Sequence, residues 1–176
     1  LDPVPDSNYT YPDGRYYTRT AWGRKYMRES YPEDQELMRE YFKPMTRWTD
    51  ALQNDFAARA DWCVMSYEEA NHPPIVKLDH STDLSAEPGD VIQLSAKGTS
   101  DPDGDELSYH WWYYKEPGNY PGEIKLNNDV SREASFKIPG DIHEEISLHI
   151  VCEVRDKGSP QLTRYRRIIV KAIPDQ

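Results

Sequence analysis

The stretch Ile146-Ser-Leu-His-Ile-Val-Cys-Glu-Val-Arg155 decides the fold class of this chain. After the first isoleucine, every second side chain is apolar: Leu148, Ile150, Cys152 and Val154. Successive side chains of a β-strand point to opposite faces, so these four residues would share one buried face. The stretch therefore predicts a strand that covers a hydrophobic core.

Six other runs between residues 71 and 176 have the composition of strands, and turn sequences separate them. The turns are rich in Gly, Pro and Asp, as in Asp101-Pro-Asp-Gly-Asp105 and Lys157-Gly-Ser-Pro160. Short strands at such spacing are typical of a β-sandwich. We therefore predict a mainly β protein in which residues 71–176 form an Ig-like, antiparallel β-sandwich. The predicted strands are residues 75–78, 91–97, 107–115, 123–126, 134–138, 146–155 and 164–172.

Residues 1–70 have a different pattern, in which an irregular stretch precedes helices. Prolines and a glycine interrupt residues 1–29, so no regular element is expected there. Ser30-Tyr-Pro-Glu33 is typical of a capping box with proline at the first helical position, which predicts a helix from Pro32 to about Lys43. This helix would begin a short α-helical segment that comes before the sandwich.

A second helix is predicted from about Met45 to Asp61, because apolar residues recur there at every fourth position. Two helices and a loop bury too little apolar surface to be stable alone. Residues 1–70 are therefore expected to be the tail end of a larger domain or a collar packed on the sandwich. The predicted apolar stripe consists of Trp48, Leu52 and Phe56, with Met45 at its start.

The charge and composition argue against several classes of partner. A net charge of −10 does not provide the basic patch that nucleic acid or an anionic membrane surface requires. No stretch approaches the roughly 18 apolar residues of a membrane span. With only 2 cysteines, Cys63 and Cys152, no disulfide framework is expected, and both should be free thiols.

Aromatic residues with a polar group dominate, since 13 Tyr and 5 Trp stand against 3 Phe, and such rings suit half-exposed contact surfaces. In the run 107–115 one alternating set would face the core, which leaves Trp112 and Tyr114 on the outer face. Together with Tyr120 in the next loop they would form a flat aromatic patch that stacks on sugar rings. The alternative is docking against a neighbouring domain, which would bury the same rings.

Asp101, Asp103 and Asp105 alternate in the loop before that strand, and carboxylate oxygens are ligands that calcium prefers. Asp156 from a neighbouring turn and Asn71 from the linker would complete a calcium site at this end of the sandwich. The spacing is not that of an EF-hand, which requires Gly at its sixth position and Glu at its twelfth. The alternative is ordinary turn chemistry, for which Asp-Pro-Asp-Gly is well suited.

No catalytic motif stands out in the chain. The five histidines lie at no metal-binding spacing from one another or from a cysteine, which argues against zinc. The sequence has no nucleophile elbow, Walker loop or dinucleotide fingerprint. Nothing selects a glycosidase pair among the 31 acidic residues. The chain by itself is therefore predicted to bind or support rather than to catalyse, with calcium as the one suggested cofactor.

The sequence also resembles two known groups of proteins, which makes the expected fold and function more specific. Gly98–Trp111 resembles the signature of polycystic-kidney-disease (PKD)-like and cadherin-like modules, a Ser-x-Asp-Pro-Asp-Gly loop before a strand with Tyr-x-Trp. Over the whole chain, five runs resemble a bacterial family described as cellulose-binding, in which a nucleoside-hydrolase-like domain precedes a C-terminal Ig-like/PKD-like β-sandwich. The runs are Arg47–Cys63, Glu69–Pro74, Asp101–Asp105, Tyr120–Gly122 and Leu162–Arg167.

The resemblance implies that residues 1–70 are the last part of the hydrolase-like domain and residues 71–176 the sandwich. Nucleoside hydrolases also have a late His-Asp-Pro-Leu-type motif whose Asp binds calcium, and Thr49-Asp-Ala-Leu52 resembles it with Thr in place of His. Asp50 would then be a metal ligand only together with the upstream domain. The alternative is that Asp50 stabilises a helix N-terminus, where negative charge meets the helix dipole.

The leading hypothesis is a non-catalytic C-terminal accessory module of a secreted bacterial protein linked to polysaccharides such as cellulose or plant cell-wall glycan. It would bind carbohydrate or scaffold the upstream domain, in the periplasm, at the cell surface or outside the cell. The competing hypothesis is the C-terminal part of a nucleoside-hydrolase-like glycosidase whose catalytic residues lie upstream. An adhesion or protein–protein module is a third reading, which follows from the fold class alone.

Overall fold

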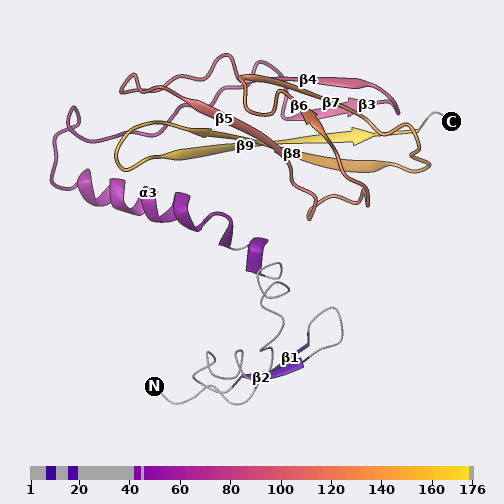
Figure 1. The fold of residues 1–176 in the computed structure, drawn as a ribbon, viewed down its shortest axis with the longest axis horizontal. Helices are drawn as coiled ribbons and strands as arrows, with labels where there is room; N and C mark the ends of the chain where they lie inside the picture. Colours follow the sequence, from indigo (N-terminus) through magenta and orange to yellow (C-terminus); the bar gives the residue numbers. More distant parts are fainter. Residues whose placement is uncertain (1–6, 11–15, 20–41, 45, 175–176) are drawn as a thin grey trace. The chain divides into compact units, whose positions relative to one another are not determined.

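The computed structural model describes residues 7–10, 16–19, 42–44 and 46–174 (Figure 1). The chain divides into two compact units, Leu1–Thr49 and Asp50–Gln176. In the first unit, β1 (Ser7–Thr10) and β2 (Tyr16–Arg19) pair in antiparallel register. The expectation of no regular element here was wrong for these two strands, whose Tyr and Thr residues favour extended backbone.

Helix α3 (Thr49–Asp61) comes before the strands of the main sheets and confirms the second predicted helix, with a later start. The first predicted helix lies largely outside the described residues, apart from helical turns at residues 42–44. Because α3 belongs to the same compact unit as those strands, the unit boundary falls at Thr49. The predicted boundary at residues 70/71 concerns where a hydrolase-like domain ends, and it stays a prediction.

Strands fill most of the second unit and form two sheets (Figure 1). The four-stranded sheet has the order β3-β9-β8-β5, and the three-stranded sheet has the order β4-β7-β6. In the first sheet the bounds are β3 Asp83–Ala86, β9 Thr163–Ala172, β8 Ile146–Arg155 and β5 Ser108–Tyr113. In the second they are β4 Val91–Ser95, β7 Glu133–Lys137 and β6 Leu126–Asn127.

A single hydrophobic core joins the two sheets. Trp111 of β5 is 1% exposed, Phe136 of β7 is fully buried, and both belong to one cluster. The apolar side of β8 is buried in the same cluster, as its alternation predicted. The mainly β, two-sheet fold with a short helix before it is therefore confirmed, and Cys152 lies in its core as a free thiol.

Three details of the strand prediction were wrong. Residues 75–78 form only an isolated bridge between Ile75 and Ser100, and the strand predicted at 123–126 begins only at Leu126. Strand β3 was not predicted, and it runs parallel to β9, so the sheet is not purely antiparallel. Its sequence Asp-Leu-Ser-Ala has little intrinsic strand preference, and pairing with a strand distant in sequence decides its conformation.

Within the ranges that the structure describes, no helix is long and apolar enough to cross a bilayer.

Candidate functional site

The candidate site lies on the outer face of the four-stranded sheet. Trp112 of β5 is opposite Val151 of β8, which is in turn opposite Arg167 of β9. Their sequence neighbours Trp111 and Cys152 are buried in the core, so this row points away from it. The row crosses three strands that share one continuous hydrogen-bonded sheet, which makes it a rigid support for a binding surface.

Trp112 and Tyr114 lie side by side on this face, as the alternation predicted. Their ring centroids are 5.4 Å apart and their planes are tilted by 56°. The Tyr114 backbone N–H donates to the carbonyl of His149 at 2.7 Å, so the chain stays against β8 beyond the end of β5. The two half-buried rings therefore form an angled corner rather than the flat patch that was expected.

Tyr120 does not join this pair. It is half-buried against the hydrophobic core, and the Tyr113 hydroxyl donates to its carbonyl at 3.3 Å. The loop before it is held by Asn119, whose side-chain oxygen accepts from Ser147 N–H at 2.7 Å. At Gly118 a Cβ would lie 2.6 Å from the Ser147 carbonyl, so this approach requires glycine. The structure thus brings together two of the three predicted aromatic residues.

A small polar pocket of about 200 Å³ lies next to this pair along β5 and β8. Glu153, two residues from Val151, lines it together with Ser108, His110 and Arg155. The Glu153 side chain is only 9% exposed and forms an ion pair with Arg155. Its Oε1 is the atom that contacts the Arg155 guanidinium, so this carboxylate oxygen is already paired. A carboxylate has several lone pairs, so a ligand hydroxyl group can still donate to it beside the arginine.

His149, one of two histidines on this face, is the more buried of them. Burial, together with the positive charge of Arg167, lowers the pKa of His149 below its usual value. Its Nε2 lies 3.3 Å from the Ser147 hydroxyl, and its Nδ1 is buried without a partner within the described ranges. Burial, followed by the negative charge of Glu153, raises the pKa of Tyr165, which pairs with Glu153 across β8 and β9. The charged group of the site is therefore the Glu153–Arg155 ion pair.

The acidic loop uses its carboxylates mainly as turn acceptors. Asp101 Oδ1 accepts from the N–H groups of Asp103 and Asp105, at 2.9 and 3.1 Å. The Asp103 carboxylate holds His72, whose Nδ1 lies 3.0 Å from Asp103 Oδ1. Asp101 Oδ2 is buried and has no hydrogen-bond partner in the described part of the chain. This geometry fits the turn chemistry that was the alternative to calcium.

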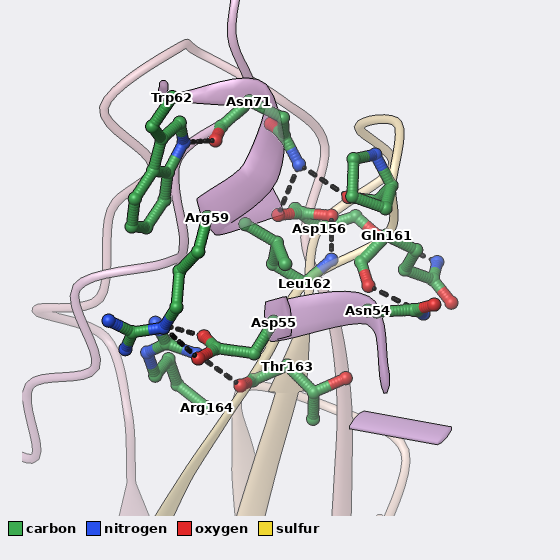
Figure 2. A network of polar contacts seen from close by, with 11 residues as sticks. Asn54, Asp55, Arg59, Trp62, Asn71, Asp156, Gln161, Leu162, Thr163 and Arg164 are labelled. Atoms are coloured by element: carbon green, nitrogen blue, oxygen red, sulfur yellow. Dashed lines mark hydrogen bonds and ion pairs between the residues drawn. The ribbon is translucent and has the colours of Figure 1, made fainter. Parts of the chain in front are cut away.

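Asp156 is fully buried at the junction between the sandwich and the segment before it (Figure 2). Its carboxylate accepts from Leu162 N–H at 2.8 Å, Gly158 N–H at 3.1 Å and the Asn71 side-chain amide at 3.1 Å. Burial raises the pKa of Asp156, and these hydrogen bonds oppose that increase. Asp156 and Asn71 therefore come together as predicted, but through hydrogen bonds.

Asp50 lies exposed in the first turn of α3, as expected for a residue that favours a helix N-terminus. Across the residues that the structure describes, no group of three or more His, Cys, Asp or Glu side chains is arranged to hold a metal. Calcium binding by any of the predicted ligands stays a prediction.

Comparison with known proteins supports the resemblance found in the sequence. Residues 91–172 match the family described as cellulose-binding protein Sde0182, C-terminal domain. This Sde0182 C-terminal domain match covers both sheets except β3, and it includes Trp112, Tyr114 and Glu153. The predicted kinship with a cellulose-binding family is therefore confirmed.

A solved structure extends the likeness beyond the Sde0182 C-terminal domain. It is a nucleoside hydrolase-related hypothetical protein from Saccharophagus degradans that is associated with carbohydrate metabolism. The identity is 38% and the TM-score 0.68, over 72% of this chain and 32% of that one. This chain thus spans about a third of the length of that relative.

A weaker structural match is the PKD domain from the KIAA 1837 protein, with 18% identity and a TM-score of 0.43. That match covers 58% of this chain and 90% of the PKD domain. No curated protein matches the chain.

Proposed function

We propose that this sandwich is a non-catalytic accessory domain that binds polysaccharide on the outer face of its four-stranded sheet. The observation that carries the proposal is the corner formed by Trp112 and Tyr114 beside the pocket of Glu153. The cellulose-binding name of the matching family supports this class of ligand, with cellulose or another plant cell-wall glycan as the candidate.

The chemistry of the face suits a sugar chain. Aromatic rings that are already half-buried stack on the apolar faces of pyranose rings at little cost in side-chain entropy. Arg167 supplies donors on this face, and the Glu153–Arg155 ion pair supplies both a donor and an acceptor, so hydroxyl groups beside a stacked ring find partners. A few oriented polar groups beside an apolar surface are the usual composition of a small-molecule site.

Affinity electrophoresis in gels that contain cellulose derivatives, xylan or pectin tests the proposal. We expect migration of the chain to be retarded in at least one gel, and Trp112→Ala to abolish the retardation. Glu153→Gln should weaken it by about tenfold, the cost expected for one charged hydrogen bond. Val130→Ser is the control, because Val130 is 71% exposed in the loop between β6 and β7. Normal migration in every gel would contradict sugar binding.

A second proposal concerns the whole polypeptide. Because the solved relative is nucleoside hydrolase-related and this chain spans 32% of it, we propose a hydrolase-like domain upstream that contains the catalytic residues. The 176-residue chain should then cleave no nucleoside or aryl glycoside, whereas the full-length gene product should. Activity that survives in the chain alone would contradict this division of roles.

The location and the cofactor follow as proposals from the same reasoning. A domain that binds plant or microbial polysaccharide meets its ligand outside the cytoplasm, so we propose that it is periplasmic, at the cell surface or secreted. Fractionation of cells that express the full-length gene tests the location. Calcium is proposed only at Asp101, whose Oδ2 is the one buried oxygen of the acidic loop without a partner within the described ranges.

A further inference from the structure

Helix α3 turns its polar side toward the sandwich. The Asn54 side-chain amide donates to the Gln161 carbonyl at 2.9 Å, and Asp55 Oδ1 lies 3.0 Å from an Arg164 nitrogen (Figure 2). Between these contacts and the end of the helix, Ala58 is 1% exposed. The side of the helix that faces the sandwich is therefore polar apart from a small side chain.

The opposite side of α3 is apolar and open to solvent. Leu52 is 66% exposed and Phe56 is 77% exposed, although they are four residues apart and lie on the same face of the helix. An amphipathic helix normally buries such a stripe, because burial removes apolar surface from water. Packing against the sandwich alone would be expected to bury the apolar side of α3, and the helix instead exposes it.

The apolar surface continues past the helix. Five of the nine large hydrophobic side chains that are exposed in the described part of the chain fall within residues 52–67. The same segment contains an apolar pocket of about 370 Å³, lined by Trp62, Tyr67 and His72 among others. The His72 ring stacks on both aromatic rings, at 3.8 Å from Tyr67 and 5.7 Å from Trp62. A concentration of this kind on one short segment marks an interaction surface.

The segment is also tied firmly to the sandwich at its second end. The Trp62 indole N–H donates to the Asn71 carbonyl at 2.8 Å, and the Asn71 side chain donates to Asp156 and to the Pro160 carbonyl. A Cβ at Gly158 would lie 2.2 Å from the Asn71 side chain, so the approach is close. The apolar surface is therefore presented by a fixed element, not by a loose tail.

We infer that the apolar face of residues 49–72 is the docking surface for the nucleoside-hydrolase-like domain of the same polypeptide. The matching family is described as a C-terminal domain, and the solved relative extends well beyond the third of it that this chain covers. The face starts on the first element of the unit, where an upstream domain would be connected. The inference rests on the proposed upstream domain and is independent of sugar binding.

Cys63 is a native reporter of this contact. It is exposed and lies in the turn two residues after α3 ends, within the same apolar segment. Alkylation by a maleimide, followed by mass spectrometry, should be fast in the 176-residue chain and at least about tenfold slower in the full-length gene product. A tenfold decrease corresponds to a docked state about 1.4 kcal/mol more stable than the open one. Cys152 is the internal control, because it is buried and its pKa is raised to about 12.

Phe56→Ser in the full-length protein should restore fast alkylation of Cys63, whereas Val130→Ser should not. Equal rates in the chain and in a full-length protein that contains the hydrolase-like domain would overturn the docking surface alone. A full-length gene product without that domain would overturn the upstream-domain proposal as well. Alkylation that slows as the concentration of the 176-residue chain rises would identify a second copy as the occupant, and would also overturn the inference.

Discussion

The two sheets and the segment around α3 differ in the burial of their large apolar side chains. The sheets bury Trp111 and Phe136 in a shared core, whereas α3 exposes Leu52 and Phe56 and faces the sandwich with polar groups. The sandwich is therefore stabilised by its own core, whereas the position of α3 depends on its polar contacts with the sandwich. One compact unit can therefore contain both a well-packed core and an exposed apolar surface that is available for another domain.

The largest expected effect tests this contrast directly. Trp111→Ala should lower the free energy of unfolding by about 3–5 kcal/mol, because it empties a buried core position. It also removes the indole N–H that donates to the Ser131 carbonyl at 2.8 Å. Phe56→Ala should change the stability of the same chain by no more than about 0.5 kcal/mol. Urea unfolding measures both changes. A large loss of unfolding free energy with Phe56→Ala would show that this side chain is part of the core after all.

The next effect concerns the junction between the two regions. Asp156→Ala should cost about 2–4 kcal/mol, because it leaves buried N–H groups, among them that of Leu162, without an acceptor. Asp156→Asn keeps an acceptor oxygen and removes a buried charge, so its cost should be smaller. Thermal unfolding of the two variants ranks them, and equal losses would show that the charge itself, not the acceptor, holds the junction.

Acid should loosen the attachment of α3. Arg59, followed by Arg164, holds the pKa of Asp55 below its ordinary value despite the opposing effect of burial. A depressed carboxyl pKa contributes stability that is present above the unfolded pKa of about 3.9 and is lost as the pH falls through the folded value. We expect a contribution below about 1 kcal/mol for this partly exposed pair.

The pH dependence of the free energy of unfolding, compared between the chain and Asp55→Asn, measures this contribution. The variant should lose the part of the slope that appears below about pH 4. Asp50→Asn is the matched control, because Asp50 is an exposed carboxylate on the same helix. A slope unchanged in Asp55→Asn would mean that the ion pair with Arg164 does not secure the helix.

Calcium should have the smallest effect. Most carboxylate oxygens of the acidic loop and of Asp156 already accept hydrogen bonds from N–H groups, so a cation would have to displace them. We expect excess calcium to raise the melting temperature by no more than about 2 °C, since few oxygen ligands remain for a cation that prefers six to eight. Differential scanning fluorimetry with calcium and with a chelator checks this. A larger rise that Asp101→Asn cancels would establish a true calcium site.

Part of the fold and of the candidate site was predictable from the sequence. The alternation around Ile150 identified the core side of β8, and the same rule placed Trp112 and Tyr114 on the outer face. Tyr120 could not be placed in this way, because it follows a loop whose path is decided by contacts of Asn119 with β8. Glu153 was missed because its burial depends on neighbours from other strands, not on its own run.

The sequence by itself determined the periodicities and therefore the elements: strands where apolar residues alternate, and a helix where Leu52 and Phe56 recur. These properties are local, since the geometry of a strand or helix repeats within a few residues. Only the tertiary structure decided which side of that helix is buried. Its partners Gln161 and Arg164 lie more than a hundred positions along the chain, and no local pattern encodes such a contact.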